Sequence, residues 1–152
     1  MTDGTIGSGV GRLIVKLRAA HGAIPIEGGT VLIRPYTDGK DSPVYSLTTD
    51  ESGMTGYVDL PTPPAISSLV PGTKGPVYSE YNITSSKDGY YTVENIGVPV
   101  FDGITSVQIV EMIPLTEADR NSAVPPEVRY NEQNGYRMLT SESNSNSTEV
   151  SE

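Results

Sequence analysis

Glycine and proline interrupt this chain at such short intervals that long helices are excluded. Its 152 residues include 16 Gly and 12 Pro, which weaken or end helices and mark turns. Between these breaks apolar and polar residues alternate, as in residues 10–20, where Leu13, Val15 and Leu17 share one face. A period of two is typical of a half-buried β-strand. The sequence therefore predicts short strands joined by turns.

Seven segments are predicted to be strands, with turn signals such as Asp38-Gly39 and Asp88-Gly89 between them. Glycine in these turns supplies the positive φ that tight connections require. No segment has the pattern of an amphipathic helix, so the predicted fold class is all-β, a seven-stranded antiparallel β-sandwich. The predicted strands are residues 10–20, 30–36, 43–49, 55–60, 80–86, 90–98 and 104–113.

The predicted domain covers residues 10–115 and is flanked by two polar segments. Residues 1–9 contain three Gly and little apolar weight, which predicts a flexible N-terminus. Residues 116–152 are predicted to be a polar acidic tail, largely disordered, because they offer few apolar groups to bury. Whether residues 118–137 dock on the sandwich is left open. Deleting residues 121–152 is expected to leave the domain folded.

Charge and composition exclude several function classes. The net charge of −9 would repel a phosphate backbone, so no nucleic-acid partner is expected. No apolar run approaches the roughly 20 residues that cross a bilayer, so no membrane insertion is expected. The absence of Cys and the single His exclude disulfides, thiolate catalysis and sites built from several Cys or His ligands. The start of the chain has no export signal, which predicts cytoplasmic synthesis.

The one imidazole, His21, lies in a predicted turn near Glu27. An imidazole can in principle act as a general acid or base, but no Ser or Asp partner can be placed beside it, so an exposed turn histidine is favoured. Some adhesin sandwich domains join a Lys of the first strand to an Asn of the last strand through an amide bond. Lys16 lies in the first predicted strand. It falls on the polar face and residues 104–113 contain no Asn, so no crosslink is expected.

The acidic residues of the predicted turns could bind calcium through their carboxylate oxygens. These residues are Asp38, Asp41, Asp50 and Glu51. Asp beside Gly is common in turns, and the spacing of an EF-hand loop is absent, so a turn role is favoured. No catalytic residue, cofactor or metal site is predicted.

A predicted loop over residues 61–81 is the preferred contact surface. Its five prolines restrict the backbone, and loops on a rigid scaffold often carry binding residues. Tyr side chains suit contact surfaces because they offer large area at low entropic cost. The alternative is that the loop caps one end of the core. The predicted partner-binding residues are Tyr78, Tyr81, Leu69 and Val70.

Two stretches, residues 23–31 (AIPIEGGTV) and 47–53 (LTTDESG), resemble carboxypeptidase regulatory-like domains, which have a prealbumin-like sandwich fold. Further segments are similar to the N-terminal domain of bacterial spore cortex-lytic enzymes. These segments are residues 57–61 (YVDLP), 75–83 (GPVYSEYNI), 89–91 (GYY) and 100–108 (VFDGITSVQ). The resemblance covers about residues 11–115, in order.

In those enzymes the sandwich precedes a separate lytic domain and is not itself the catalyst. The resemblance therefore implies a non-catalytic binding or scaffolding domain associated with spore or cell-wall processes, and not an enzyme. Its partner would be a protein or peptidoglycan, and a spore-associated location would follow. The alternatives are an accessory subunit that positions a peptidoglycan-lytic enzyme, or a structural assembly protein.

Overall fold

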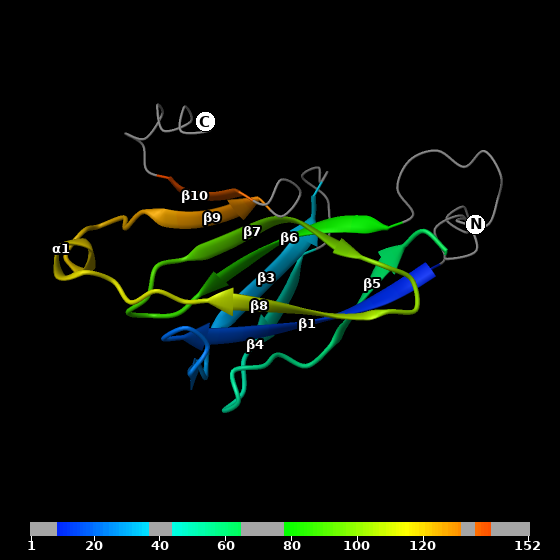
Figure 1. The fold of residues 1–152 in the computed structure, drawn as a ribbon, viewed down its shortest axis with the longest axis horizontal. Coiled ribbons are helices and arrows are strands. Elements are labelled where there is room, and N and C mark those ends of the chain that lie inside the picture. Colours follow the sequence, from blue (N-terminus) through cyan, green and yellow to red (C-terminus); the bar gives the residue numbers. More distant parts are fainter. Residues whose placement is uncertain (1–8, 37–43, 65–77, 132–135, 141–152) are drawn as a thin grey trace.

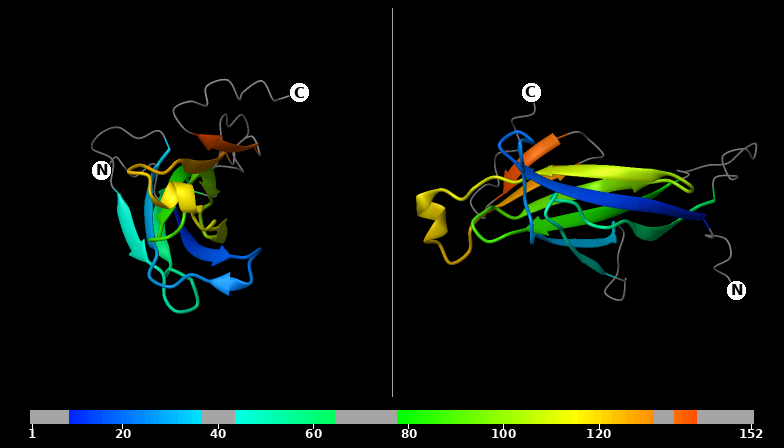
Figure 2. Two further views of the ribbon diagram at one scale, coloured as in Figure 1. Left: turned by 90° about the vertical axis from the view of Figure 1, so that its left-hand side faces the viewer. Right: turned by 90° about the horizontal axis from the view of Figure 1, so that it is seen from below.

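The computed structural model describes residues 9–36, 44–64, 78–131 and 136–140, and these residues form two β-sheets (Figure 1). Their one helix is α1 (Glu117–Arg120), a single turn that projects beyond the ends of the strands (Figure 2). None of the helical residues described is part of a span long and apolar enough to cross a membrane. The prediction of an all-β chain is confirmed.

The first sheet is organised around β1 (Gly9–Ala19). The first half of β1 pairs antiparallel with β5 (Val58–Thr62), and its last residues pair antiparallel with β2 (Ile24–Pro25). Along residues 12–18, β1 also pairs with β8 (Thr105–Glu111), and this pairing is parallel. β2, β5 and β8 therefore all pair with β1.

The second sheet has the order β10-β9-β7-β6-β3-β4. All of its neighbours pair antiparallel except β7 and β9, which are parallel. The register between β6 and β7 shifts once, at a bulge between Tyr81 and Ile83. The strands are β3 (Thr30–Pro35), β4 (Tyr45–Thr48), β6 (Ser79–Ser86), β7 (Val93–Val100), β9 (Glu127–Asn131) and β10 (Tyr136–Thr140).

Both sheets contribute to one hydrophobic core. Leu13, Val15 and Leu17 of β1 have no exposed surface, as the alternation in residues 10–20 predicts. Ile33 and Ile83 join them from the second sheet and are equally buried. Burying one side chain of this size stabilises the fold by about 1.5–3 kcal/mol before entropic costs.

All seven predicted strands are present, but the predicted strand count and the exclusively antiparallel pairing are wrong. The described residues contain ten strands, of which β2, β9 and β10 were not predicted. The pairs β1–β8 and β7–β9 are parallel. The physical reason is that a period of two determines which side chains share a face, whereas strand direction depends on how distant segments meet.

Residues 116–131 form regular structure that their composition does not suggest. Thr116 caps α1 by accepting a hydrogen bond from the Asp119 N–H (3.1 Å), and the Tyr91 hydroxyl donates to the Asp119 carboxylate. β9 then joins β7, and Val128 is only 4% exposed within the core. The predicted tail therefore includes part of the second sheet. Residues 1–8 and 141–152 lie outside the described residues.

Deleting residues 121–152 should therefore destabilise the domain, contrary to the expectation from sequence. The deletion removes Val128 from the core and exposes the paired edge of β7, so we expect the free energy of unfolding to fall by about 2–3 kcal/mol. Urea unfolding followed by circular dichroism measures this change. Deleting residues 141–152 is the control, since it removes no described strand. Equal stability of the two truncated proteins would show that β9 contributes nothing.

The turn at Gly53 packs against β1 at Leu17. Gly53 has a φ of 78°, its N–H donates to the Asp50 carbonyl (2.8 Å), and its own carbonyl accepts from the Leu17 N–H (2.8 Å). A Cβ atom here would lie 2.6 Å from the Leu17 carbonyl oxygen. The turn therefore requires glycine for both conformation and space.

Gly53→Ala should lower the free energy of unfolding by at least about 2 kcal/mol, because strained backbone and steric overlap add. Gly56→Ala is the matched control: Gly56 has no positive φ, and a Cβ there would meet no atom within 4 Å. Urea unfolding of both variants measures the difference. A Gly53→Ala variant as stable as Gly56→Ala would contradict the steric argument.

Candidate functional site

Of the predicted contact loop, residues 61–64 and 78–81 are described, and its two tyrosines have different environments. Tyr81 is 4% exposed and its hydroxyl donates to the Pro61 carbonyl (2.6 Å), so its ring belongs to the core. Tyr78 is half-buried, with its ring centroid 5.2 Å from that of Phe101. Leu69 and Val70 lie outside the described residues. A partner contact by Tyr78 stays a prediction.

Burial of Tyr81 raises the pKa of its phenol from 10.0 to about 12. Desolvation is the main cause, because a phenolate loses hydration in the core. The phenol of Tyr45 adds to it, since two ionised phenols would repel each other. The folded chain therefore retains the proton of Tyr81 at a pH where the unfolded chain loses it.

His21 lies in an exposed turn and is held there by its backbone. Its φ is 57°, next to Ala20 at 55°, a conformation that residues other than glycine rarely adopt. The His21 N–H donates to a carboxylate oxygen of Glu111 (2.7 Å), which ties this turn to the end of β8. The contact involves the main chain, so it gives the imidazole no acid or base partner.

Asp50 has the turn role that the sequence favours. One oxygen of its carboxylate accepts from the N–H groups of Ser52 (2.8 Å) and Met54 (3.1 Å). Asp38 and Asp41 lie outside the described residues. Where side chains are described, no group of three or more His, Asp or Glu residues is arranged to hold a metal ion.

The edge of β8 is the most distinctive surface of the described chain. The Arg12 N–H donates to the Ile104 carbonyl (3.0 Å) and the Met112 N–H donates to the Arg18 carbonyl (2.6 Å). Since backbone groups of successive residues point to opposite sides of a strand, the even-numbered residues of β8 face β1. The odd-numbered residues direct their N–H and C=O groups away from β1, and no described strand pairs with them. These residues, which we call the β8 edge, are Thr105, Val107, Ile109 and Glu111.

The side chains of the β8 edge point outward, onto the same face as the outward residues of β1. Val107 is 48% exposed and Ile109 is 60% exposed, although both are β-branched and apolar. In the register of the parallel pair, Val107 lies opposite Ile14 and Ile109 lies opposite Lys16. We call this surface the β1–β8 face. Its outward side chains are Arg12, Ile14, Lys16, Arg18, Thr105, Val107, Ile109 and Glu111.

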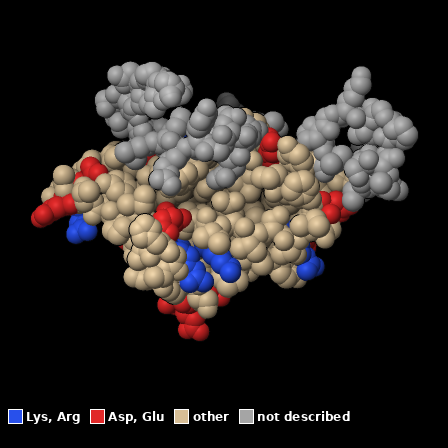
Figure 3. Space-filling view, in the orientation of Figure 1, with Lys and Arg blue, Asp and Glu red and all other residues tan. Residues whose placement is uncertain are grey.

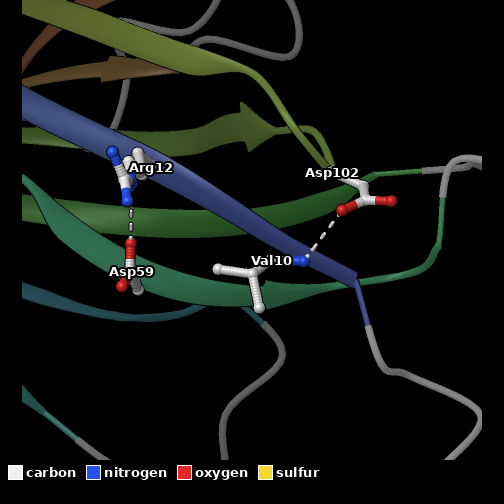
Figure 4. A network of polar contacts seen from close by, with 4 residues as sticks. All are labelled: Val10, Arg12, Asp59 and Asp102. Atoms are coloured by element: carbon white, nitrogen blue, oxygen red, sulfur yellow. Dashed lines mark hydrogen bonds and ion pairs between the residues drawn. The ribbon is translucent and has the colours of Figure 1, made fainter.

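At one end of this face, polar contacts fix β1 to its neighbours (Figure 4). The Arg12 guanidinium lies 3.1 Å from the Asp59 carboxylate and 4.2 Å from the centre of the Tyr57 ring. The Val10 N–H donates to the Asp102 carboxylate (3.0 Å). The charge of Arg12 is thus already compensated by Asp59. Because this ion pair is exposed, it adds little to stability.

The rest of the face carries two further cations. Lys16 and Arg18 lie on β1 at alternate positions, and within the described part of the chain neither forms an ion pair. The space-filling view shows basic side chains over β1, with acidic side chains close beside them (Figure 3). A basic region beside an apolar strand edge is unusual in a chain whose net charge is −9.

The edges formed by β2, β5 and β4 are better protected against a further strand. β2 has two residues, one of them Pro25; β5 contains Pro61; and β4 has four residues. Short edge strands and proline prevent unwanted pairing. β8 has seven residues without proline, and its register against β1 runs without a bulge. Sequence reasoning missed this site because residues 104–113 were predicted as a strand with no indication that it lies at an edge.

Comparisons with known proteins give a distant structural likeness. No protein-family model matches the chain. No curated protein matches it. Similar solved structures include catechol 1,2-dioxygenase from Acinetobacter sp. ADP1 inhibited by bound mercury, with 16% identity and a TM-score of 0.49 over 85% of this chain and 61% of that chain.

Two further structures show a similar level of likeness. Catechol 1,2-dioxygenase from Pseudomonas arvilla C-1 has 12% identity and a TM-score of 0.49 over 80% of this chain and 58% of that chain. The Bacillus anthracis TIE protein has 16% identity and a TM-score of 0.46 over 88% of this chain and 24% of that chain. The chain thus spans less than two thirds of the length of each of these three proteins.

These neighbours contradict the function expected from the sequence. Catechol 1,2-dioxygenases are enzymes and not cell-wall binding proteins. The expected non-catalytic spore or cell-wall domain, its accessory and structural-assembly alternatives, and the prediction that the chain is not an enzyme are therefore withdrawn. A resemblance carried by short motifs reflects the fold more than the function, because turns such as Asp50–Gly53 recur for geometric reasons. TM-scores below 0.5 assign no activity to this chain.

Ionisation of Tyr81 should weaken the fold at high pH. Its folded pKa of about 12 exceeds the ordinary value of 10.0, so its contribution is complete below pH 10 and is lost as the pH rises toward 12. We expect Tyr81→Phe to show a smaller loss of stability between pH 9 and 11 than the unchanged protein. At neutral pH the variant should be about 1–2 kcal/mol less stable, because the Pro61 carbonyl loses its donor.

Urea unfolding at a series of pH values measures both effects. Tyr57→Phe is the control, because Tyr57 is exposed. The same pH dependence in the Tyr81→Phe, Tyr57→Phe and unchanged proteins would show that Tyr81 does not ionise with a raised pKa.

Proposed function

We propose that this chain binds an extended peptide segment of a partner protein, which adds to the first sheet as a strand beside β8. The observation that carries the proposal is the β8 edge, a regular seven-residue strand whose outer backbone groups pair with no described strand. Strand addition of this kind is a recurrent mode of peptide recognition.

The side chains on the outer face support the same mode of binding. A peptide strand beside β8 would place its outward side chains next to Val107 and Ile109, which are now exposed to water. Pairs of β-branched residues on neighbouring strands contribute about 0.2–1 kcal/mol each. Each backbone hydrogen bond adds a net contribution of about 0.5–1.5 kcal/mol. The edge can therefore supply affinity from the backbone and selectivity from the side chains.

We also propose that the two sheets form a sandwich of the prealbumin-like type. Support comes from the single core that both sheets share, in which Leu17 of β1 and Val31 of β3 are fully buried. The resemblance of residues 11–115 to carboxypeptidase regulatory-like domains agrees with this architecture. In such an arrangement β8 would lie at the rim of one layer, where a peptide can approach it.

Val107→Pro tests strand addition directly. The Val107 N–H points away from β1, so proline removes a donor from the β8 edge without removing a bond between β8 and β1. The probe is a fluorescently labelled eight-residue peptide that alternates Val and Thr. We expect the unchanged protein to bind it and Val107→Pro to lose at least about tenfold in affinity, measured by fluorescence anisotropy.

Two further variants separate binding from folding. Val107→Thr keeps the N–H and a similar shape, and should bind the probe nearly as well as the unchanged protein. Gln108→Pro removes a hydrogen bond to β1 and should lower the free energy of unfolding by about 1–3 kcal/mol, whereas Val107→Pro should not. Equal binding by a folded Val107→Pro variant would refute strand addition at β8.

Hydrogen exchange gives an independent readout. The amides of Val107 and Ile109 should exchange rapidly in the free protein and slowly with bound peptide, because only then do they donate to a neighbouring strand. The amides of Gln108 and Val110 already donate to β1 and should be protected in both states. Unchanged exchange at Val107 and Ile109 in the presence of bound probe would place the peptide elsewhere.

A further inference from the structure

We infer that the peptide bound at β8 carries an acidic residue directly opposite Ile109, where its carboxylate reaches Lys16. This inference rests on the proposed function and adds the chemistry of the partner. It follows from the register of β1 and β8, in which Lys16 lies opposite Ile109 on the outward face. The peptide residue next to Ile109 would continue the same row of side chains.

The distances across the sheet permit this contact. Neighbouring strands lie about 4.8 Å apart, so the peptide backbone would be about 10 Å from that of β1. The side chains of a lysine and a glutamate can together span this separation across the top of Ile109. Ile109 carries no charge and cannot compete for either group. The contact would lie over an apolar surface that binding removes from water, which strengthens a charge pair.

Neighbouring charges restrict the preference to this one position. Arg12 is already paired with Asp59. Arg18 lies opposite Glu111, an acidic residue in the same row whose carboxylate accepts from the His21 N–H. A peptide carboxylate next to Glu111 would be repelled, whereas one next to Ile109 meets Lys16 with no competing acid in the same row. The expected ligand therefore has an acidic residue over the middle of β8.

The chain's overall charge does not oppose this preference. The net charge is −9, but at physiological ionic strength charges more than about 8 Å apart are largely screened. The two cations nearest the β8 edge therefore dominate the local selection. They are too few to bind a nucleic acid, whose affinity requires many phosphate contacts.

A second copy of the chain fits the site less well than an acidic peptide. If two copies of β8 paired antiparallel about Gln108, Val107 of one would lie opposite Ile109 of the other, and Thr105 would lie opposite Glu111. No acidic residue would then lie opposite Ile109, and Lys16 would remain without a partner. In this register charge complementarity therefore favours the acidic peptide.

The experiment compares three labelled eight-residue peptides on the full 152-residue protein. One alternates Val with Glu, one Val with Lys and one Val with Thr. In 0.15 M salt we expect the Glu peptide to bind about threefold to fivefold more tightly than the Lys peptide, the size of effect that exposed charge pairs produce. Lys16→Glu should reverse this order.

Lys87→Glu is the matched control, because it makes the same change in net charge in the turn between β6 and β7, two strands of the second sheet. It should leave the preference for the Glu peptide unchanged. A reversal in Lys87→Glu as well would assign the preference to net charge and overturn the inference.

The two proposals fail in different ways. Equal binding of the Glu and Lys peptides, together with loss of Val/Thr peptide binding in Val107→Pro, would overturn the role of Lys16 and leave strand addition standing. No binding of any peptide would refute strand addition itself. Sedimentation velocity gives the remaining outcome: a dimer that Val107→Pro dissociates would show that a second copy occupies the edge, and would overturn the acidic ligand.

Discussion

The pairing of β1 on both of its edges is the constraint on which the rest of the structure depends. β5, β2 and the turn at Gly53 bind one edge, and β8 binds the other along residues 12–18. The inward residues Leu13, Val15 and Leu17 are completely buried in the core that the second sheet also lines. With one face buried in this way, a shift of register by one residue would bring these side chains into water, so the register is firmly determined.

This arrangement also explains why the candidate site lies at β8. Because β1 uses the even-numbered residues of β8 for pairing, the odd-numbered residues direct their backbone groups away from β1, and their exposed side chains point away from the core. The parallel pairing of β8 with β1 therefore leaves one edge of β8 unpaired, exposes two β-branched side chains and places them beside the cations of β1. The second sheet continues beyond β7 through β9 and ends at β10.

The predicted contact loop and the site from the structure differ for a physical reason. Tyr81 has the residue type of a contact surface, but its position on the inward face of β6 places it in the core, with its hydroxyl bound to Pro61. Residue type alone does not distinguish an anchor in the core from a contact at the surface. Val107 and Ile109 have the opposite property, because their composition suggests burial while their position at an edge exposes them.

The sequence by itself determined the all-β class, the seven predicted strands, the inward face of β1 and the turn role of Asp50. These features depend on the local period of apolar residues and on turn geometry, which neighbouring residues encode. Only the tertiary structure decided that β8 is parallel to β1, that β9 joins β7 and that Lys16 lies beside Ile109. Such pairings join segments far apart in the chain, and their free energy comes from backbone bonds and burial that exist only once those segments have met.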